Sequence, residues 1–194
     1  MINSTFVHLP CYSKWERILN YQFSDNDWKT FNIISNKSTP CTHLKWFQYK
    51  IIHNILPTKQ YLHKLGYIES PVYSFCKSEA ETIDHLFWTC EYASKLWKDL
   101  ETWIHSVQIP ITLTIGKVIL GIKGKNNNPI NAIILLTKQI IYQSSKKGFT
   151  PSITYIKKEI IKYYHITKSI YLSNQNEQTF IKFWSTLHLL FQNS

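Results

Sequence analysis

Residues 71–90 read PVYSFCKSEAETIDHLFWTC, and they hold three soft metal ligands at a compact spacing. Cys76, His85 and Cys90 follow the pattern C-x8-H-x4-C. Thiolate and imidazole ligands suit Zn2+, and a structural zinc site normally closes with four ligands, usually starting from a C-x2-C pair. The position that would complete such a pair, three residues before Cys76, holds Tyr73. The pattern therefore predicts a degenerate CCHC-type zinc knuckle that lacks one ligand.

The missing ligand leaves two structures open for the knuckle. In the first, the site binds Zn2+ through three residues, and water or a remote ligand such as His53 or His63 completes it. In the second, the ring of Tyr73 packs where the lost ligand would stand and forms a small aromatic cluster. Zn2+ is accordingly a candidate cofactor whose affinity this substitution weakens or abolishes.

Outside the knuckle, the sequence favours a mainly α-helical fold. The chain has only five glycines and seven prolines, and its apolar residues recur mostly at intervals of three and four. Thr58 and Gly66 are typical of the start and end of a short helix, and Ser78 with Glu81 has the spacing of a capping box. Further helices are expected over residues 92–105, 127–144, 177–191 and from 150 onward.

The helix expected after the capping box has one apolar face, formed by Ile83, Leu86, Phe87 and Cys90. His85 lies off this face. It could therefore point toward a metal while the apolar residues point toward the core, although a surface histidine would have the same position.

Composition divides the chain into three predicted segments. Residues 1–70 form an amino-terminal helical segment, residues 71–121 carry the knuckle, and residues 122–194 form a basic helical segment. The boundary before the last segment is the polar stretch GIKGKNNN at residues 121–128, which could equally be a surface loop.

The net charge of +10 is concentrated in the carboxyl-terminal half. Residues 1–100 carry a net charge of +2, whereas residues 101–194 carry +8. All basic residues except Arg17 are lysines, which suit phosphates better than base edges. The candidate nucleic-acid-binding residues are Lys146, Lys147, Lys157, Lys158, Lys162, Tyr163 and Lys168. The alternatives are that the lysines only solvate helix faces and that Tyr163 is an interior aromatic residue.

The sequence lacks the motifs of the enzyme classes that could use such a site. A zinc deaminase needs His-x-Glu with a later C-x2-C pair, and a metalloprotease needs His-Glu-x-x-His; neither is present. The chain has four aspartates, none adjacent to another, and no glycine-rich phosphate loop. We therefore expect no enzymatic activity.

The region around the knuckle resembles the reverse-transcriptase zinc-binding region of LINE-type non-LTR retrotransposons. That family carries Glu-Thr before the knuckle histidine and Trp after the last cysteine, which here are Glu81, Thr82 and Trp97. The resemblance extends to KWFQYKIIHNILPTKQYLHKL at residues 45–65, and downstream to residues 119–142, so that it covers roughly residues 10 to 190. It implies a carboxyl-terminal region that accompanies the polymerase portion of a polyprotein and helps to hold RNA or DNA. The Ala-Asp-Asp turn of the family's polymerase is absent.

Two functions follow from these observations. The first is accessory, non-catalytic and largely sequence-independent binding of RNA or DNA. The second is a structural or protein-interaction remnant that packed against the polymerase and does not bind nucleic acid itself. No long apolar run and no charged leader is present, so we expect an intracellular protein without a signal peptide or membrane partner. Nuclear and cytoplasmic locations fit the sequence equally well.

Overall fold

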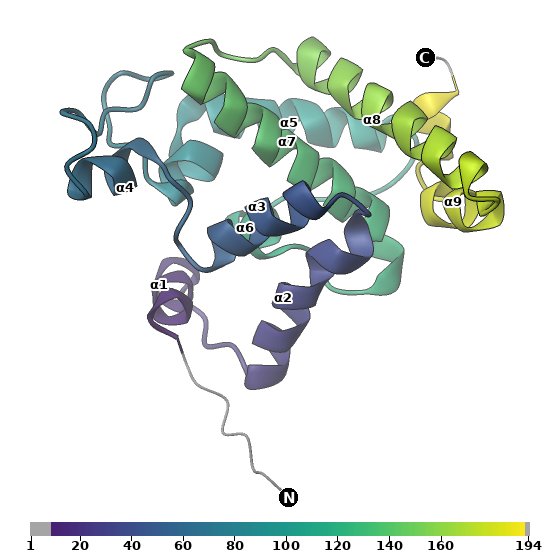
Figure 1. The fold of residues 1–194 in the computed structure, drawn as a ribbon, viewed down its shortest axis with the longest axis horizontal. Coiled ribbons are helices and arrows are strands. Elements are labelled where there is room, and N and C mark those ends of the chain that lie inside the picture. Colours follow the sequence, from purple (N-terminus) through teal and green to yellow (C-terminus); the bar gives the residue numbers. More distant parts are fainter. Residues whose placement is uncertain (1–8, 193–194) are drawn as a thin grey trace, which may run out of the picture.

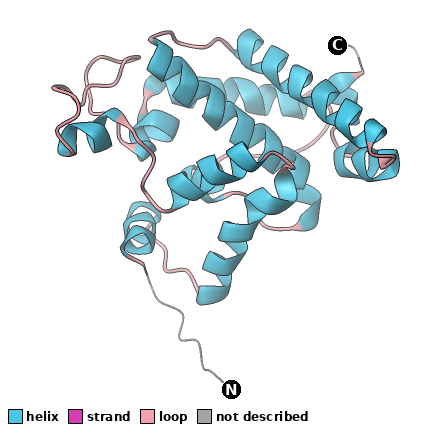
Figure 2. Cartoon of the chain, viewed as in Figure 1, coloured by secondary structure: helices cyan, strands magenta, loops and turns pink. Residues whose placement is uncertain are grey.

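The computed structural model describes residues 9–192, and helices joined by loops make up most of this part of the chain (Figure 2). Within it, the only extended pairing is a single antiparallel bridge between Val72 and Ala80. The mainly α-helical prediction is confirmed. The helices are α1 (Pro10–Leu19), α2 (Asp25–Ser38), α3 (Thr42–Ile52), α4 (Lys59–Lys64), α5 (Glu91–His105), α6 (Ile115–Leu120), α7 (Asn128–Lys147), α8 (Ile153–Ser173) and α9 (Glu177–Trp184), with short helical turns at His85–Thr89, Lys125–Asn127 and His188–Phe191.

Local signals set several of the helix ends as expected. The side chain of Thr58 accepts a hydrogen bond from the backbone N–H of Tyr61 at the start of α4, and Gly66 follows its end with a φ of +76°. A left-handed residue after a helix favours glycine because a Cβ would be strained there. Pro129 lies in the first turn of α7, and Gly148 ends that helix in the left-handed conformation. The helices expected over residues 92–105 and 127–144 are α5 and α7.

The expected capping box was wrong. The chain becomes helical only after Thr82, whose hydroxyl accepts the backbone N–H of His85 at 2.9 Å. Ser78 lies in the preceding turn, and the Glu81 side chain is used for tertiary contacts instead. The basic helix expected from residue 150 begins at Ile153, behind the cap of Ser152. The last expected helix is also shorter, because α9 ends at Trp184 and the chain continues through turns.

Helix α7 crosses the middle of the molecule (Figure 1) and packs against α2, α3, α8 and α9. Its sequence is apolar around most of its circumference, as expected for a helix surrounded by others. Residues 129–138 of this helix are all buried. The core is one cluster that includes residues from all three predicted segments, and the proposed segment boundaries stay predictions.

The expected absence of a signal peptide rests partly on residues 1–8, which lie outside the described residues. Among residues 9–192, no helix combines the length and the apolar character needed to cross a bilayer.

Candidate metal centre

A tight turn positions the first candidate ligand, Cys76. The backbone N–H of Tyr73 donates to the carbonyl of Glu79 at 2.8 Å, and the N–H of Lys77 donates back to the carbonyl of Tyr73 at 3.0 Å. Lys77 adopts a left-handed conformation with a φ of +57°, which reverses the chain directly after Cys76. The turn of a metal knuckle is therefore formed although the residue at its first ligand position is a tyrosine.

A single turn of π-helix, His85–Thr89, positions the other two ligands. Cys90 lies five positions after His85, and in an α-helix this spacing would place the two about 140° apart around the axis. The wider turn brings them to the same side, and the N–H of Cys90 donates to the carbonyl of His85 at 3.2 Å. The local π-turn thus converts the H-x4-C spacing into a shared face.

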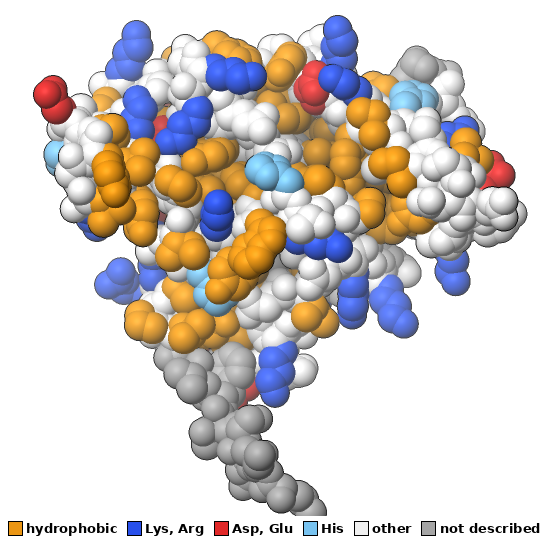
Figure 3. All heavy atoms as spheres, in the orientation of Figure 1, with side chains coloured by type: hydrophobic (Ala, Val, Ile, Leu, Met, Phe, Trp, Pro, Cys, Tyr) orange, Lys and Arg blue, Asp and Glu red, His pale blue; other side chains and the backbone are white. Residues whose placement is uncertain are grey.

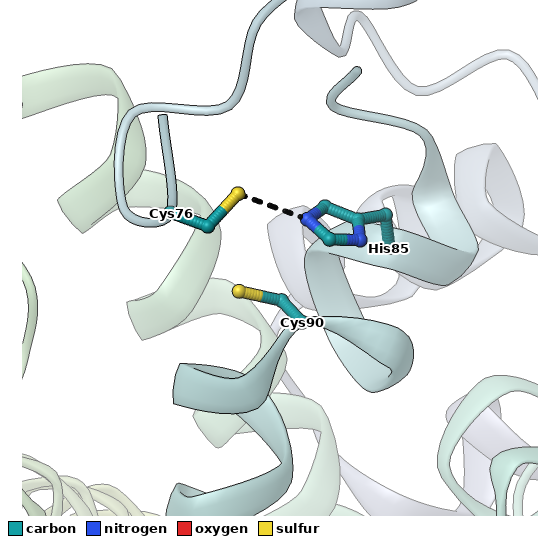
Figure 4. A group of neighbouring side chains, drawn as sticks. All are labelled: Cys76, His85 and Cys90. Carbon is teal, nitrogen blue, oxygen red and sulfur yellow. Dashed lines mark hydrogen bonds between the residues drawn. The ribbon is translucent and has the colours of Figure 1, made fainter. Parts of the chain in front are cut away.

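The three predicted ligands converge (Figure 4). The ligand atoms of Cys76, His85 and Cys90 all lie within 4.8 Å of one another. The Cys76 Sγ and His85 Nε2 atoms are 3.3 Å apart. Zinc bonds of about 2.0–2.3 Å in a tetrahedral site would hold sulfur and nitrogen about 3.5 Å apart. The arrangement is therefore compatible with one Zn2+ ion bound by all three residues.

Neighbouring polar groups orient the imidazole of His85 for such a role. Its Nδ1 lies 3.0 Å from the hydroxyl of Thr89 and 3.3 Å from the carboxylate of Glu79. The Nε2 atom lies against the Sγ of Cys76. With the proton on Nδ1, donated to these acceptors, the lone pair of Nε2 would be free to face a metal instead. A carboxylate behind a ligating histidine is a common arrangement in zinc sites, because it fixes the tautomer and the ring orientation.

The two thiols differ in their acidity. Burial opposes ionisation of Cys76, but hydrogen bonds from Ser78, from the backbone N–H of Glu79 and from His85 together lower its pKa to about 6. Burial raises the pKa of the Cys90 thiol, and the neighbouring Cys76 acts in the same direction. The Cys76 thiol therefore ionises more readily than the Cys90 thiol, and the thiolate is the form that binds a metal.

Tyr73 fills the position of the absent ligand with an aromatic ring. The side chain is fully buried, its ring centre lies 4.7 Å from that of Phe75, and its ring meets His85 edge-on at 5.4 Å. Its hydroxyl is the one buried side-chain polar atom without a hydrogen-bond partner among the described residues. Burial raises the pKa of Tyr73, and the nearby Cys90 adds to this shift. The ring of Tyr73 therefore packs in an aromatic cluster, as the second alternative predicted, and binding of Zn2+ by the three remaining residues stays a prediction.

The three-residue donor set nevertheless fits Zn2+ by its chemistry. Two thiols and one imidazole are soft donors, they converge, and the histidine is held by a carboxylate. The remote histidines named in the sequence lie elsewhere: His53 Nδ1 lies 3.8 Å from the Sγ of Cys11, and His63 Nδ1 lies 3.0 Å from the carbonyl of Ile68. Cys11 and Cys41 are partly buried free thiols outside the group.

Glu81 is a buried anchor of the knuckle that the sequence did not reveal. Its carboxylate accepts the backbone N–H of Lys59 at 3.0 Å and the hydroxyl of Ser145 at 2.6 Å. These bonds tie the knuckle to the start of α4 and to the end of α7. Its capping-box spacing from Ser78 pointed to a local role, and only the distant partners reveal the tertiary one.

The predicted nucleic-acid-binding residues are distributed over α7 and α8, and the assignment stays a prediction. Lys147, Lys158, Lys162 and Lys168 are exposed. The other three contact the protein itself. Lys146 donates to the carbonyl of Pro57 at 2.7 Å, Lys157 lies over the ring of Trp103, and the Tyr163 hydroxyl lies 2.6 Å from that of Thr39. Burial raises the pKa of Tyr163 to about 12.

Residues 11–97 match the family described as zinc-binding in reverse transcriptase. The matched part contains the whole knuckle and extends from α1 into α5. No curated protein matches the chain.

Proposed function

We propose that this chain is an accessory, non-catalytic nucleic-acid-binding region of a LINE-type non-LTR retrotransposon reverse transcriptase. In this function it acts inside the cell beside the polymerase portion of the parent polyprotein and holds RNA or DNA with little sequence preference. Support comes from the family match over residues 11–97, from the converging Cys-His-Cys group and from the basic carboxyl-terminal half. Bound Zn2+ would supply a structural crosslink between the turn at Cys76 and the helical turn at His85 and Cys90.

The exposed charge of α8 is the observation that carries the proposal. Lys158, Lys162 and Lys168 are exposed and form no ion pair with any described residue, and Glu159 is the only acidic residue of this helix. Unpaired lysines can neutralise phosphates and release counterions. Because an ammonium group is a point charge without a fixed fork of donors, the binding would depend on salt more than on sequence.

The test is fluorescence anisotropy with labelled single-stranded RNA and DNA at low and physiological salt. The variant is the triple substitution Lys158→Gln, Lys162→Gln and Lys168→Gln, since these side chains are exposed and their loss should leave the fold intact. If all three contact phosphates, the slope of log affinity against log salt should fall by about 2. Circular dichroism would confirm that the variant is folded.

The matched control replaces three exposed lysines outside the candidate set, Lys95→Gln, Lys98→Gln and Lys125→Gln, and should leave the slope unchanged. An equal loss in both variants would mean that the charge acts diffusely and that α8 is not the site. Absence of binding by the unaltered chain at low salt would contradict the function itself.

A protein-interaction remnant is the second candidate, and exposed apolar side chains near the carboxyl terminus favour it. Ile166, Ile170, Ile181 and Leu189 are each about half exposed on α8, α9 and the turn that follows. When exposed apolar side chains lie together, they are typical of a surface that has lost a binding partner. Concentration-dependent self-association without salt-dependent nucleic-acid binding would support this second function.

A further inference from the structure

The outer face of α3 carries a row of exposed aromatic rings. Trp46 is 58% exposed and Tyr49 is 43% exposed, although both belong to residue types that are usually largely buried. Leu44, Phe47 and Ile51 of the same helix are buried and face the core. The inner face of α3 therefore supplies the packing of this helix, and Trp46 and Tyr49 remain on the outside.

The rings contact one another and are held in place. Trp46 and Tyr49 meet edge-on with ring centres 5.4 Å apart, and the ring centres of Tyr49 and His53 are 4.0 Å apart. His53 is half-buried, and its Nδ1 lies 3.8 Å from the Sγ of Cys11 on α1. The histidine thus supports the tyrosine from behind. We name Trp46, Tyr49 and His53 the α3 ring row.

Positive charge surrounds the α3 ring row. Lys45 and Lys50 flank Trp46 and Tyr49 along the helix, and the sequence of α3 contains no acidic residue. Neither lysine forms an ion pair or a side-chain hydrogen bond with a described residue. In Figure 3 apolar side chains gather over α3 in the middle of the face, with lysine and arginine side chains around them.

This combination of groups matches the chemistry of single-stranded nucleic acid. Stacking on aromatic rings accommodates any base, while nearby lysines neutralise the backbone. The exposed rings of Trp46 and Tyr49 lie about 4.5 Å apart along the helix axis, which is room for one or two bases of a single strand. A protein partner fits less well, because lysine is depleted in the centres of protein interfaces.

We propose that the α3 ring row is a stacking platform for unpaired bases, with Lys45 and Lys50 neutralising the adjoining phosphates. The inference rests on the proposed nucleic-acid function and deepens it. It assigns the contact with bases to α3, and the contact with phosphates to the lysines of α3 and α8. A duplex, whose bases are already stacked, gains nothing from the rings. The platform therefore selects single strands.

The experiment compares the unaltered chain with Trp46→Ala/Tyr49→Ala, using a labelled single-stranded oligonucleotide and the matching duplex in anisotropy titrations. Single-strand affinity should fall about tenfold or more, because stacking contributes to binding at each base. Duplex affinity and the salt slope should not change, since no lysine is removed. The matched control is Tyr67→Ala, which removes a ring that is 74% exposed on another part of the surface and should have no effect.

The outcomes separate this inference from the function on which it rests. If the unaltered chain binds single strands and the double variant binds equally well, the stacking platform is overturned and the nucleic-acid function stands. If the unaltered chain binds neither probe at low salt, the function itself fails. If sedimentation shows a dimer that Trp46→Ala/Tyr49→Ala converts to a monomer, the face is a contact between copies of the chain and the inference is overturned.

Discussion

The knuckle and the α7 core bury polar groups in different ways. In the core, α7 is surrounded by apolar side chains, and its one buried charge-bearing group, Lys138, reaches only the Gln48 side chain, 2.5 Å away. In the knuckle, short turns bring three candidate metal ligands together, and the buried hydroxyl of Tyr73 has no partner among the described residues. The stability of the core therefore depends on apolar burial. The stability of the knuckle depends on the hydrogen bonds of Glu81 and on any metal held by its candidate ligands. Four substitutions separate these two sources of stability.

The largest loss is expected from the core. Ile133 is fully buried in α7, and Ile133→Ala should lower the free energy of unfolding by about 4 kcal/mol, because it removes apolar contacts and leaves a cavity. Urea denaturation monitored by circular dichroism measures the change. The loss should be the same with and without Zn2+. If added Zn2+ restored the lost free energy of unfolding, the stabilities of the core and the knuckle would be coupled.

The next effect tests the knuckle. Tyr73→Cys supplies the missing fourth ligand, so Zn2+ at about 100 times its dissociation constant should stabilise the variant by about 3 kcal/mol. Thermal unfolding with added Zn2+ and with a chelator measures the difference. Tyr73→Ser is the matched control, since it opens a similar space with a poorer ligand. Equal responses of the two variants to Zn2+ would contradict a lapsed four-ligand site.

The third substitution removes the buried amine of the core. Burial lowers the pKa of Lys138 to about 7, well below its usual value of 10.5. The unfolded chain therefore binds more protons than the folded chain between about pH 7 and 10.5, and the stability cost of Lys138 is largest below pH 7 and vanishes above 10.5. Lys138→Met should stabilise the protein by about 2 kcal/mol near pH 6, with a gain that shrinks as the pH rises.

Unfolding free energies of the unaltered protein and of Lys138→Met, measured over a series of pH values, test this prediction. A gain that is constant from pH 6 to pH 10 would mean that Lys138 titrates normally in the folded protein. Gln48→Leu offers a comparison, because it removes the acceptor of the amine and should make the cost of Lys138 larger.

The smallest effect concerns the phenol of Tyr73. Tyr73→Phe keeps the ring contacts with Phe75 and His85 and removes a buried hydroxyl without a partner, so it should stabilise the metal-free protein by about 1 kcal/mol. Denaturation in the presence of a chelator measures it. A destabilised variant would show that the hydroxyl has a bonding partner in solution.

Much of the fold followed from local signals in the sequence. Both ends of α4 and the start of α7 were predicted from Thr58, Gly66 and Pro129, because caps and proline act within one turn of the helix. The prediction failed where a side chain had a distant alternative. Glu81 has the spacing of a capping residue, but its carboxylate is buried and accepts hydrogen bonds from two donors far away in the sequence, Lys59 and Ser145.

The sequence by itself determined the mainly helical class and singled out the three candidate ligands that converge, because helix periodicity and ligand spacing are local properties. Only the tertiary structure decided that a π-turn brings His85 and Cys90 to one side and that Tyr73 is buried without a partner. It also decided that Tyr163 faces Thr39 while Trp46 stays exposed. The physical reason is that burial depends on which helices pack against a face, and residues far apart in the chain determine that packing.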